Sequence, residues 1–320
     1  MSFLFKNALK VSQKVYAVAS RKESNFGRNW KLFPNKQYAN DLIYSSLVSD
    51  KPCMVARFGS TEMLCLLNYL GVTANNRNVS DYIKGYSLPW WWEPGMMAQM
   101  QKWSGFFPAT EDKILEFCEL MMNDIKEVDI LGSWLKEEAF FADALGVVKR
   151  VVLEDIEPFF APNPWTRALE GKKVLVVHPF ADTIEQQYQK RELLFDDQLL
   201  PDFELTTIKA VQTSAGEPSV FSDWFEALNY MKSEINAADF DICIIGCGAY
   251  GFPLAAHVKR MGKKSIHLAG VTQLLFGIKG KRWENFVVYP YANLFNQHWV
   301  RPGQAEKPKN AQVVEGACYW

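Results

Sequence analysis

The sequence predicts an α/β fold in which a largely parallel sheet carries helices on both faces, preceded by an N-terminal helical extension. Short apolar segments of strand length alternate with longer segments of helical period, most clearly in the second half of the chain. The short segments are apolar at nearly every position, which is typical of parallel strands buried on both sides. Turns containing glycine follow several of them and lead into helices, as in βαβ units.

The first expected strand is Cys53–Arg57, which ends in a cation and leads into a helix that continues to Leu70. The later candidates are Val128–Leu131, Val151–Leu153, Val174–Val177, Leu205–Val211, Ile242–Ile245 and Ser265–Leu268. Parallel strands share one carboxyl edge, and ligands of open α/β sheets bind there. The residues that follow these strands are therefore the candidate site residues.

We expect one composite domain rather than two independent ones. No linker rich in glycine or serine and no internal repeat divides the 320 residues. The expected parts are an N-terminal helical extension (residues 1–45), a single α/β domain (residues 46–300) and a polar, proline-containing tail (residues 301–320) that wraps over the surface.

Composition and charge exclude several classes of protein. An apolar fraction of 48% is ample for a core, and a net charge of -1 gives no overall attraction to nucleic acid. The six cysteines form no CxxC pair and stand in apolar surroundings, as reduced, buried thiols do. No apolar run reaches the roughly 20 residues of a membrane span. We therefore expect a cytoplasmic protein.

The first twenty residues have the pattern of an amphipathic helix. Lys6, Lys10 and Lys14 recur every four residues and interrupt any secretory signal core. An apolar stripe on the opposite helical face consists of Leu4, Ala8, Val11, Val15 and Val18. A helix packed on the body of the protein or on a second subunit is the favoured interpretation. Because the polar face is basic, peripheral contact with the inner face of the membrane is the alternative.

The end of the first strand predicts a phosphate site. Arg57 ends the strand, Gly59 permits a tight turn, and Ser60 can cap the helix that follows. Free backbone N–H groups at that helix end, together with the guanidinium, favour a phosphate. Glu62 in the first helical turn is a candidate base or metal ligand, and its alternative role is to stabilise the helix dipole.

Further candidates follow the strands Val174–Val177 and Leu205–Val211. His178 is a candidate acid–base group or phosphate ligand, with a structural histidine as the alternative. Arg191, on the next helix, reaches an anion or covers a solvated face. The segment Thr213–Glu217 lines the pocket or is a plain turn.

The strongest local motif is Gly246-Cys247-Gly248-Ala249-Tyr250-Gly251, a GxGxxG loop between a strand and a helix. Such a loop lets the backbone approach phosphates, so Gly246, Gly248, Tyr250 and Gly251 are candidate nucleotide-binding residues. A dinucleotide site also needs an acidic residue at the end of the next strand. The chain has Ile266-His267-Leu268-Ala269-Gly270 there. We therefore expect a mononucleotide or a nucleotide-sugar, and no NAD.

Two further clusters have a structural alternative to ligand binding, and for the tryptophans it is the commoner role. Lys279, Lys281 and Arg282 neutralise a diphosphate or form a solvated basic turn. The tryptophans of Trp90–Trp92 stack on a sugar or anchor the fold. The sequence contains no Walker motif and no zinc-ligand spacing.

Two of these motifs together carry a resemblance to a known family. Arg57-Phe58-Gly59-x-x-Glu62 early in the chain, with Ile245-Gly246-x-Gly248-x-x-Gly251 and Ile266-His267-Leu268 late, resembles the GT-D-fold glycosyltransferases. These are bacterial enzymes of surface glycan and glycoprotein assembly. The resemblance runs from about Pro52 to Trp283. It implies a Rossmann-like single domain, a nucleotide-sugar donor, commonly a UDP-sugar, and a divalent metal, Mn²⁺ or Mg²⁺.

The chain departs from the early motif of that family at one chemically important position. The family motif typically reads Arg-x-Gly-Asp-Gly-Glu, and its two carboxylates serve the metal–diphosphate site. Glu62 matches the glutamate, but Ser60 stands where the family has the aspartate. A hydroxyl is a poorer ligand for Mg²⁺ or Mn²⁺ than a carboxylate. Arg57 and the later cation cluster are an alternative source of positive charge.

The resulting hypothesis is a glycosyltransferase that moves a sugar from a nucleotide-sugar to a glycan or glycoprotein acceptor in bacterial surface polysaccharide or glycoprotein synthesis. Its candidate catalytic residues are Glu62, which is also the candidate metal ligand, and His178. Its candidate phosphate-binding residues are Arg57, Gly59, Ser60, Arg191 and the loop Gly246–Gly251. The alternative is a non-catalytic relative that binds a nucleotide or glycan. The oligomeric state stays open.

Overall fold

The computed structural model describes residues 2–20, 32–195, 199–286, 289–314 and 316–320. Its seven strands form one sheet in the order β3-β2-β1-β7-β6-β4-β5, and every neighbouring pair is parallel. The strands are β1 (Cys53–Ala56), β2 (Ile130–Ser133), β3 (Lys149–Val152), β4 (Lys173–His178), β5 (Glu204–Lys209), β6 (Ile242–Ile245) and β7 (Lys264–His267). The predicted α/β class is confirmed, and all seven predicted strands are present within two residues at each end.

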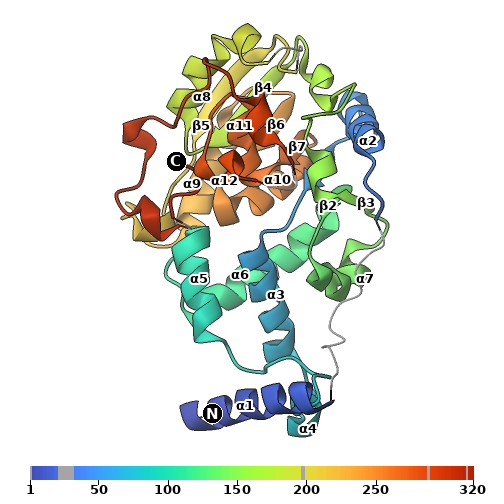
Figure 1. Ribbon diagram of the computed structural model, residues 1–320, viewed down its shortest axis with the longest axis vertical. Helices are drawn as coiled ribbons and strands as arrows, with labels where there is room; N and C mark the ends of the chain where they lie inside the picture. The colour runs from blue at the N-terminus through green and yellow to red at the C-terminus, as the bar shows by residue number, and fades with distance from the viewer. Residues whose placement is uncertain (1, 21–31, 196–198, 287–288, 315) are drawn as a thin grey trace.

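Helices cover both faces of the sheet (Figure 1). The α-helices are α1 (Phe3–Ser20), α2 (Lys36–Val48), α3 (Ser60–Thr73), α4 (Val79–Ile83), α5 (Pro94–Ser104), α6 (Glu111–Asp124), α7 (Ala142–Leu145), α8 (Ala181–Tyr188), α9 (Trp224–Ala237), α10 (Gly251–Arg260), α11 (Thr272–Leu275) and α12 (Lys281–Glu284). The core on one face contains side chains of α3, α5, α6, α9 and α10. The core on the other face contains side chains of α2, α8, α11 and α12.

The strand sequences explain why both faces are covered. In β1 and β6 successive side chains point to opposite faces, so Met54 and Ile245 join the first core while Val55 and Ile244 join the second. Every residue of these two strands is buried. A strand that is apolar at each position needs cover on both sides, and parallel crossover helices provide it.

The two terminal parts of the chain differ in how much of them packs against the sheet. Helix α2 crosses residue 45, and it packs Ile43 and Leu47 into the second core, so it belongs to the α/β domain. The tail also contributes Val314, Ala317 and Trp320 to that core. Of the predicted extension, α1 alone stands apart from the sheet, at the far end of the molecule (Figure 1).

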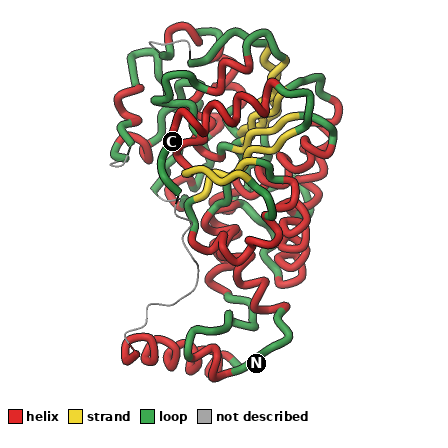
Figure 2. Tube along the Cα trace, turned by 90° about the vertical axis from the view of Figure 1, so that its right-hand side faces the viewer, coloured by secondary structure: helices red, strands yellow, loops and turns green. Residues whose placement is uncertain are grey.

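The chain leaves the carboxyl ends of some neighbouring strands toward opposite faces, and a crevice opens between such strands. After β1 the chain enters α3 on one face, whereas after β7 it enters α11 on the other. The neighbours β4 and β6 diverge in the same way, toward α8 and α10. Two of these crevices, between β1 and β7 and between β4 and β6, contain cavities among the described residues, and Figure 2 shows the strands side by side within the helical layers.

Candidate functional site

A cavity of about 390 Å³ lies in the crevice between β1 and β7. Its walls come from the segment Arg57–Glu62 after β1, the segment His267–Val271 after β7, and helix α12. Trp134, which follows β2, and Tyr319 of the C-terminal tail also line the cavity. We call this space the first cavity.

Arg57 is held rigidly at the wall of the first cavity. Its Nε and Nη2 atoms donate to the carbonyl oxygen of Phe58, at 3.1 Å and 2.8 Å, and its guanidinium lies 5.0 Å from the centre of the Trp134 ring. The Trp134 indole donates to the same carbonyl at 3.0 Å. Within the described residues, no carboxylate lies within 4 Å of this guanidinium. Burial lowers the pKa of Arg57 from its usual range, because the charged form has lost water and the more distant charges of Glu62 and Glu157 offset this loss only in part.

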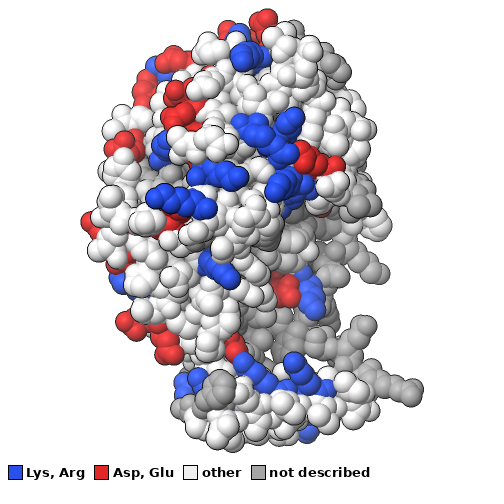
Figure 3. Space-filling view, turned by 60° about the vertical axis from the view of Figure 1, so that its left-hand side comes forward, with Lys and Arg blue, Asp and Glu red and all other residues white. Residues whose placement is uncertain are grey.

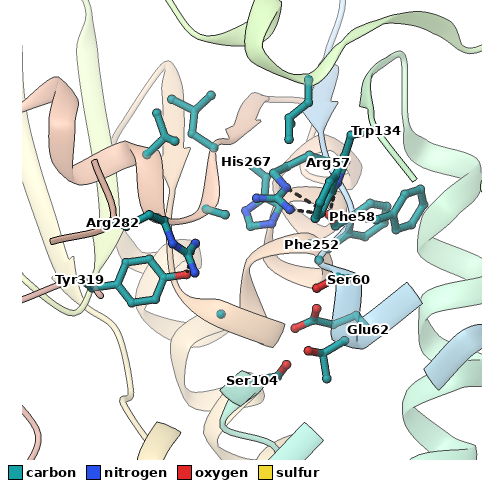
Figure 4. A pocket seen from close by; sticks show the side chains of 18 of the residues that line it. Arg57, Phe58, Ser60, Glu62, Ser104, Trp134, Phe252, His267, Arg282 and Tyr319 are labelled. Atoms are coloured by element: carbon teal, nitrogen blue, oxygen red, sulfur yellow. Dashed lines mark hydrogen bonds between the residues drawn. The ribbon is translucent and has the colours of Figure 1, made fainter. Parts of the chain in front are cut away.

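A second guanidinium faces the same space. Arg282 of α12 donates from Nη1 to the hydroxyl oxygen of Tyr319 at 3.0 Å and lies 4.7 Å from the centre of that ring. The charge of Arg282 also contributes to lowering the pKa of Arg57. Figure 4 shows the Arg282 head group pointing into the cavity from the side opposite Glu62. Two cations that repel each other in this way favour an anion between them.

The amino end of α3 opens into the first cavity. Gly59 is the residue before the helix, it supplies no capping side chain, and the first intrahelical bond runs from Met63 N to Gly59 O at 2.9 Å. The backbone N–H groups of Ser60, Thr61 and Glu62 therefore have no acceptor in the helix. Together with Arg57, these donors suit a phosphate, as the sequence predicted.

Three glutamates line the first cavity, Glu62, Glu154 and Glu157, and the sequence predicted the first of them. The Glu62 carboxylate lies near Ser60 and Ser104 in Figure 4. A Cβ atom on Gly59 would lie 1.9 Å from Glu62 Oε2, so the Glu62 carboxylate lies directly beside the start of the helix. The Glu157 carboxylate accepts a hydrogen bond from the Tyr291 hydroxyl at 2.5 Å. Burial raises the pKa of Glu157 to about 7. A carboxyl group with this pKa can exchange a proton near neutral pH.

The described residues do not suit a metal held by the protein alone. They contain no group of three or more His, Cys, Asp or Glu side chains arranged to hold an ion. Beside Glu62, the position of the family's aspartate is taken by Ser60, and two guanidiniums face the same space. Arg57 and Arg282 bring positive charge to this space without an ion.

A second cavity of about 120 Å³ lies in the crevice between β4 and β6, and it contains His178. The Nδ1 atom of His178 accepts a hydrogen bond from the backbone N–H of Phe180 at 3.0 Å. Burial lowers the pKa of His178 to about 3, so the imidazole is neutral near pH 7. A base this weak accepts a proton poorly at that pH. The predicted catalytic role of His178 is therefore unsupported, and its structural alternative fits better.

The glycine motif serves packing more than ligand binding. A Cβ atom on Gly246 would lie 2.4 Å from Ala269 O, and one on Gly251 would lie 2.2 Å from His267 Cε1. Gly248 has a φ of +56°, and it lines both cavities. Tyr250 is buried and stacks on Trp224 at 4.9 Å between ring centres. Only Gly248 keeps a place in the first cavity; Gly246 and Tyr250 line the second, and Gly251 lines neither.

Arg191 lies outside both cavities. Its Nη2 atom pairs with Asp202 Oδ1 at 2.7 Å, and its guanidinium lies 5.3 Å from the centre of the Tyr188 ring. This position removes Arg191 from the candidate phosphate ligands. The tryptophans of Trp90–Trp92 also lie elsewhere: Trp90 and Trp91 pack against Tyr82 of α4 and anchor the fold.

Sequence reasoning missed Glu157, Trp134 and Tyr319, and it left the role of Arg282 open. A signal for two of them was present. Trp134 and Glu157 follow β2 and β3, so the rule that ligands bind beyond the carboxyl ends of strands covers them as well. No local signal indicates Tyr319, because the tail reaches the cavity only through its tertiary packing.

Neither a protein-family model nor a curated protein matches the chain. Two solved structures do. One is a selenomethionine-substituted domain of unknown function 1792, at 10% identity and a TM-score of 0.38, and the other is described as that highly conserved domain, with a distinct glycosyltransferase fold, at 11% identity and a TM-score of 0.36. Each match covers 92% of this chain and 100% of the other.

Proposed function

We propose that the protein is a glycosyltransferase that takes its sugar from a nucleotide-sugar, a UDP-sugar, and holds the diphosphate of this donor between Arg57, Arg282 and the amino end of α3. The observation that carries this proposal is the guanidinium of Arg57. It is fixed by Phe58 and Trp134, it lines the first cavity, and among the described residues it has no carboxylate within 4 Å. A desolvated cation without an anion costs stability, which a bound diphosphate would recover.

The size and lining of the site suit this ligand class. A volume of about 390 Å³ falls in the usual range for small-molecule pockets. The walls combine cations with aromatic surfaces, such as Trp134 and Tyr319, on which a base or a sugar can stack. The second cavity shares Ser104, Gly248 and Tyr319 with the first, so an acceptor has adjoining space.

The chemistry follows from these positions. An acceptor hydroxyl oxygen attacks the anomeric carbon of the donor, the bond from that carbon to the diphosphate oxygen breaks, and the nucleoside diphosphate leaves with the electron pair. Arg57 and Arg282 stabilise the charge that develops on the leaving group. The acceptor proton passes to a carboxylate of the cavity. Glu157 suits this step because its pKa of about 7 allows it to take up a proton near neutral pH. Glu62 is the second candidate.

This mechanism does not need a divalent ion. In the metal-dependent family pattern an aspartate and a glutamate serve the metal and diphosphate, whereas this chain has Ser60 and Glu62 with two arginines nearby. We propose that the guanidiniums take over the neutralising role. Binding of a nucleoside diphosphate should then be nearly unchanged when Mn²⁺ is replaced by a chelator.

The test is a ligand screen followed by a transfer assay. UDP, several UDP-sugars and NAD are compared by thermal unfolding and calorimetry, with Mn²⁺ or with EDTA. We expect stabilisation by at least one nucleotide-sugar, none by NAD, and release of UDP when a glycan acceptor is added. Stabilisation by NAD with no response to any nucleotide-sugar would contradict the proposal.

A second candidate, a non-catalytic nucleotide-sugar or glycan binder, is favoured by Ser60, which stands where the family motif has its aspartate. It predicts the same binding and no turnover. An enzyme releases UDP from a bound UDP-sugar, and a binder does not. In an enzyme, Glu157→Gln should lose this release and keep the affinity for the UDP-sugar.

A further inference from the structure

Helix α1 is attached to the protein by one side only. It lies across the narrow end of the molecule, next to α4 and far from the sheet (Figures 1 and 2). Its buried residue Leu9 packs with Tyr82 and Trp91, and Gln13 Nε2 donates to the Tyr82 carbonyl oxygen at 2.9 Å. Lys10 pairs with Glu93 on the same side. These contacts fix which face of α1 points toward the body.

The opposite face of α1 is apolar and exposed. Leu4 and Val18 are 79% and 80% exposed, and Val11 and Val15 are 60% and 62% exposed. Since successive residues turn by about 100°, these side chains and Ala8 lie within one narrow stripe, directly opposite Leu9 and Gln13. A contiguous exposed apolar stripe on a monomer indicates an interaction surface.

The charge of this end of the chain decides what the surface contacts. Helix α1 has three lysines and no acidic residue. Residues 1–31 contain seven basic residues and one acidic residue, a net charge of +6; since the whole chain carries -1, residues 32–320 carry -7. Two copies of so basic a segment repel each other, whereas an anionic lipid surface attracts each of them. Figure 3 shows lysines along the upper edge of this helix and a mostly uncharged surface below.

We propose that α1 docks the protein on an anionic membrane surface, with the stripe Leu4, Ala8, Val11, Val15 and Val18 inserted at the headgroup boundary. The helix then lies in the plane of the interface, with Lys14 on the flank of the stripe and Lys6 nearer the body, and the charges of both attract the anionic lipid surface. Within the described residues no helix is long and apolar enough to cross a bilayer, so the contact is peripheral. This surface is separate from the first cavity, and it does not depend on the proposed reaction.

The experiment measures binding of the full chain to phosphatidylcholine vesicles with and without phosphatidylglycerol by co-sedimentation. The wild type should bind the anionic vesicles, and binding should weaken as salt is raised. Val11→Asp/Val15→Asp should reduce the partition coefficient by about a hundredfold, since burial of each valine contributes a factor of about ten. The matched control, Val147→Asp/Val220→Asp, makes the same change at valines that are 102% and 95% exposed elsewhere, and it should bind like the wild type.

A second variant guards against misfolding of α1. Lys6→Glu/Lys14→Glu leaves the apolar stripe intact and should weaken binding to the anionic vesicles alone. The melting temperature of each variant is compared with that of the wild type, which shows whether the α/β domain is still folded. Failure of the wild type to bind anionic vesicles would overturn the proposal. The proposal would also be overturned if the wild type did not bind vesicles and instead formed a dimer in sedimentation velocity, and if Val11→Asp/Val15→Asp abolished that dimer.

Discussion

The two crevices at the carboxyl edge of the sheet arise from the same topology and differ in their chemistry. Between β1 and β7, Arg57 has no carboxylate within 4 Å among the described residues, and no capping side chain is hydrogen-bonded to the amino end of α3. Between β4 and β6, the amino end of α8 is already occupied: Glu306 of the tail accepts from the N–H groups of Asp182 at 2.9 Å and Thr183 at 3.3 Å. His178 in that crevice is neutral near pH 7 because burial lowers its pKa to about 3. Strands whose chains leave toward opposite faces thus supply a crevice. The side chains that line the crevice decide whether an anion can bind there.

The largest expected effect concerns the carboxyl group of the first cavity. The pKa of Glu157 is about 7 in the folded protein, against an ordinary value of 4.5. Between these pH values the folded state binds more protons than the unfolded state, so the free energy of unfolding falls as pH rises, by on the order of 3 kcal/mol. Glu157→Gln removes this loss, and urea unfolding at a series of pH values measures it.

The stability advantage of Glu157→Gln should therefore grow from about pH 4.5 to about pH 7 and then level off. Parallel stability curves for the variant and the wild type would mean that Glu157 is an ordinary surface carboxylate. The first cavity would then lack a group suited to proton transfer. Its arginines would be the remaining chemical difference from the second cavity.

The next effect tests those arginines directly. Arg57→Met removes the guanidinium and keeps a long apolar side chain, so the affinity for a nucleoside diphosphate should fall about 10- to 100-fold, as expected for a charge-assisted hydrogen bond. Calorimetry measures the change. Arg191→Met is the matched control, because Arg191 pairs with Asp202 outside both cavities. Equal losses in the two variants would remove the distinction between the cavity arginine and the peripheral one.

A smaller effect concerns the glycine loop between the two crevices. A Cβ atom on Gly251 would lie 2.2 Å from His267 Cε1, so Gly251→Ala should lower stability by about 1–3 kcal/mol through overpacking. Thermal unfolding measures it. Gly95→Ala is the control, since nothing lies within 4 Å of the new atom and the change should be neutral or mildly stabilising. A Gly251→Ala variant as stable as Gly95→Ala would return the motif to the candidate ligand-binding elements.

The smallest effect tests the occupied helix end. Glu306→Gln keeps the shape of the side chain and removes its charge, so the interaction with the amino end of α8 weakens and stability should fall by about 1 kcal/mol. Chemical denaturation measures this loss. Nucleotide affinity at the first cavity should stay the same, and a marked change in it would show that the two crevices are coupled.

Much of the fold could be predicted because its signals are local. The apolar runs Val174–Val177 and Ile242–Ile245 predict buried strands wherever they lie in the sheet, and both are present as β4 and β6. The unit Arg57–Glu62 was equally visible, because a strand, a glycine turn and a helix start stand next to one another in the chain. Its residues line the first cavity as a group.

The sequence by itself therefore determined the α/β class, the strand positions and one wall of the candidate site. The tertiary structure decided the rest, because strand order depends on long-range packing that no local pattern records. It placed β1 beside β7, brought Arg282 and Tyr319 to Arg57, and buried Glu157 at the same cavity. It also separated Arg191 and His178 from that site, since the helices after β4 and β1 leave the sheet toward opposite faces.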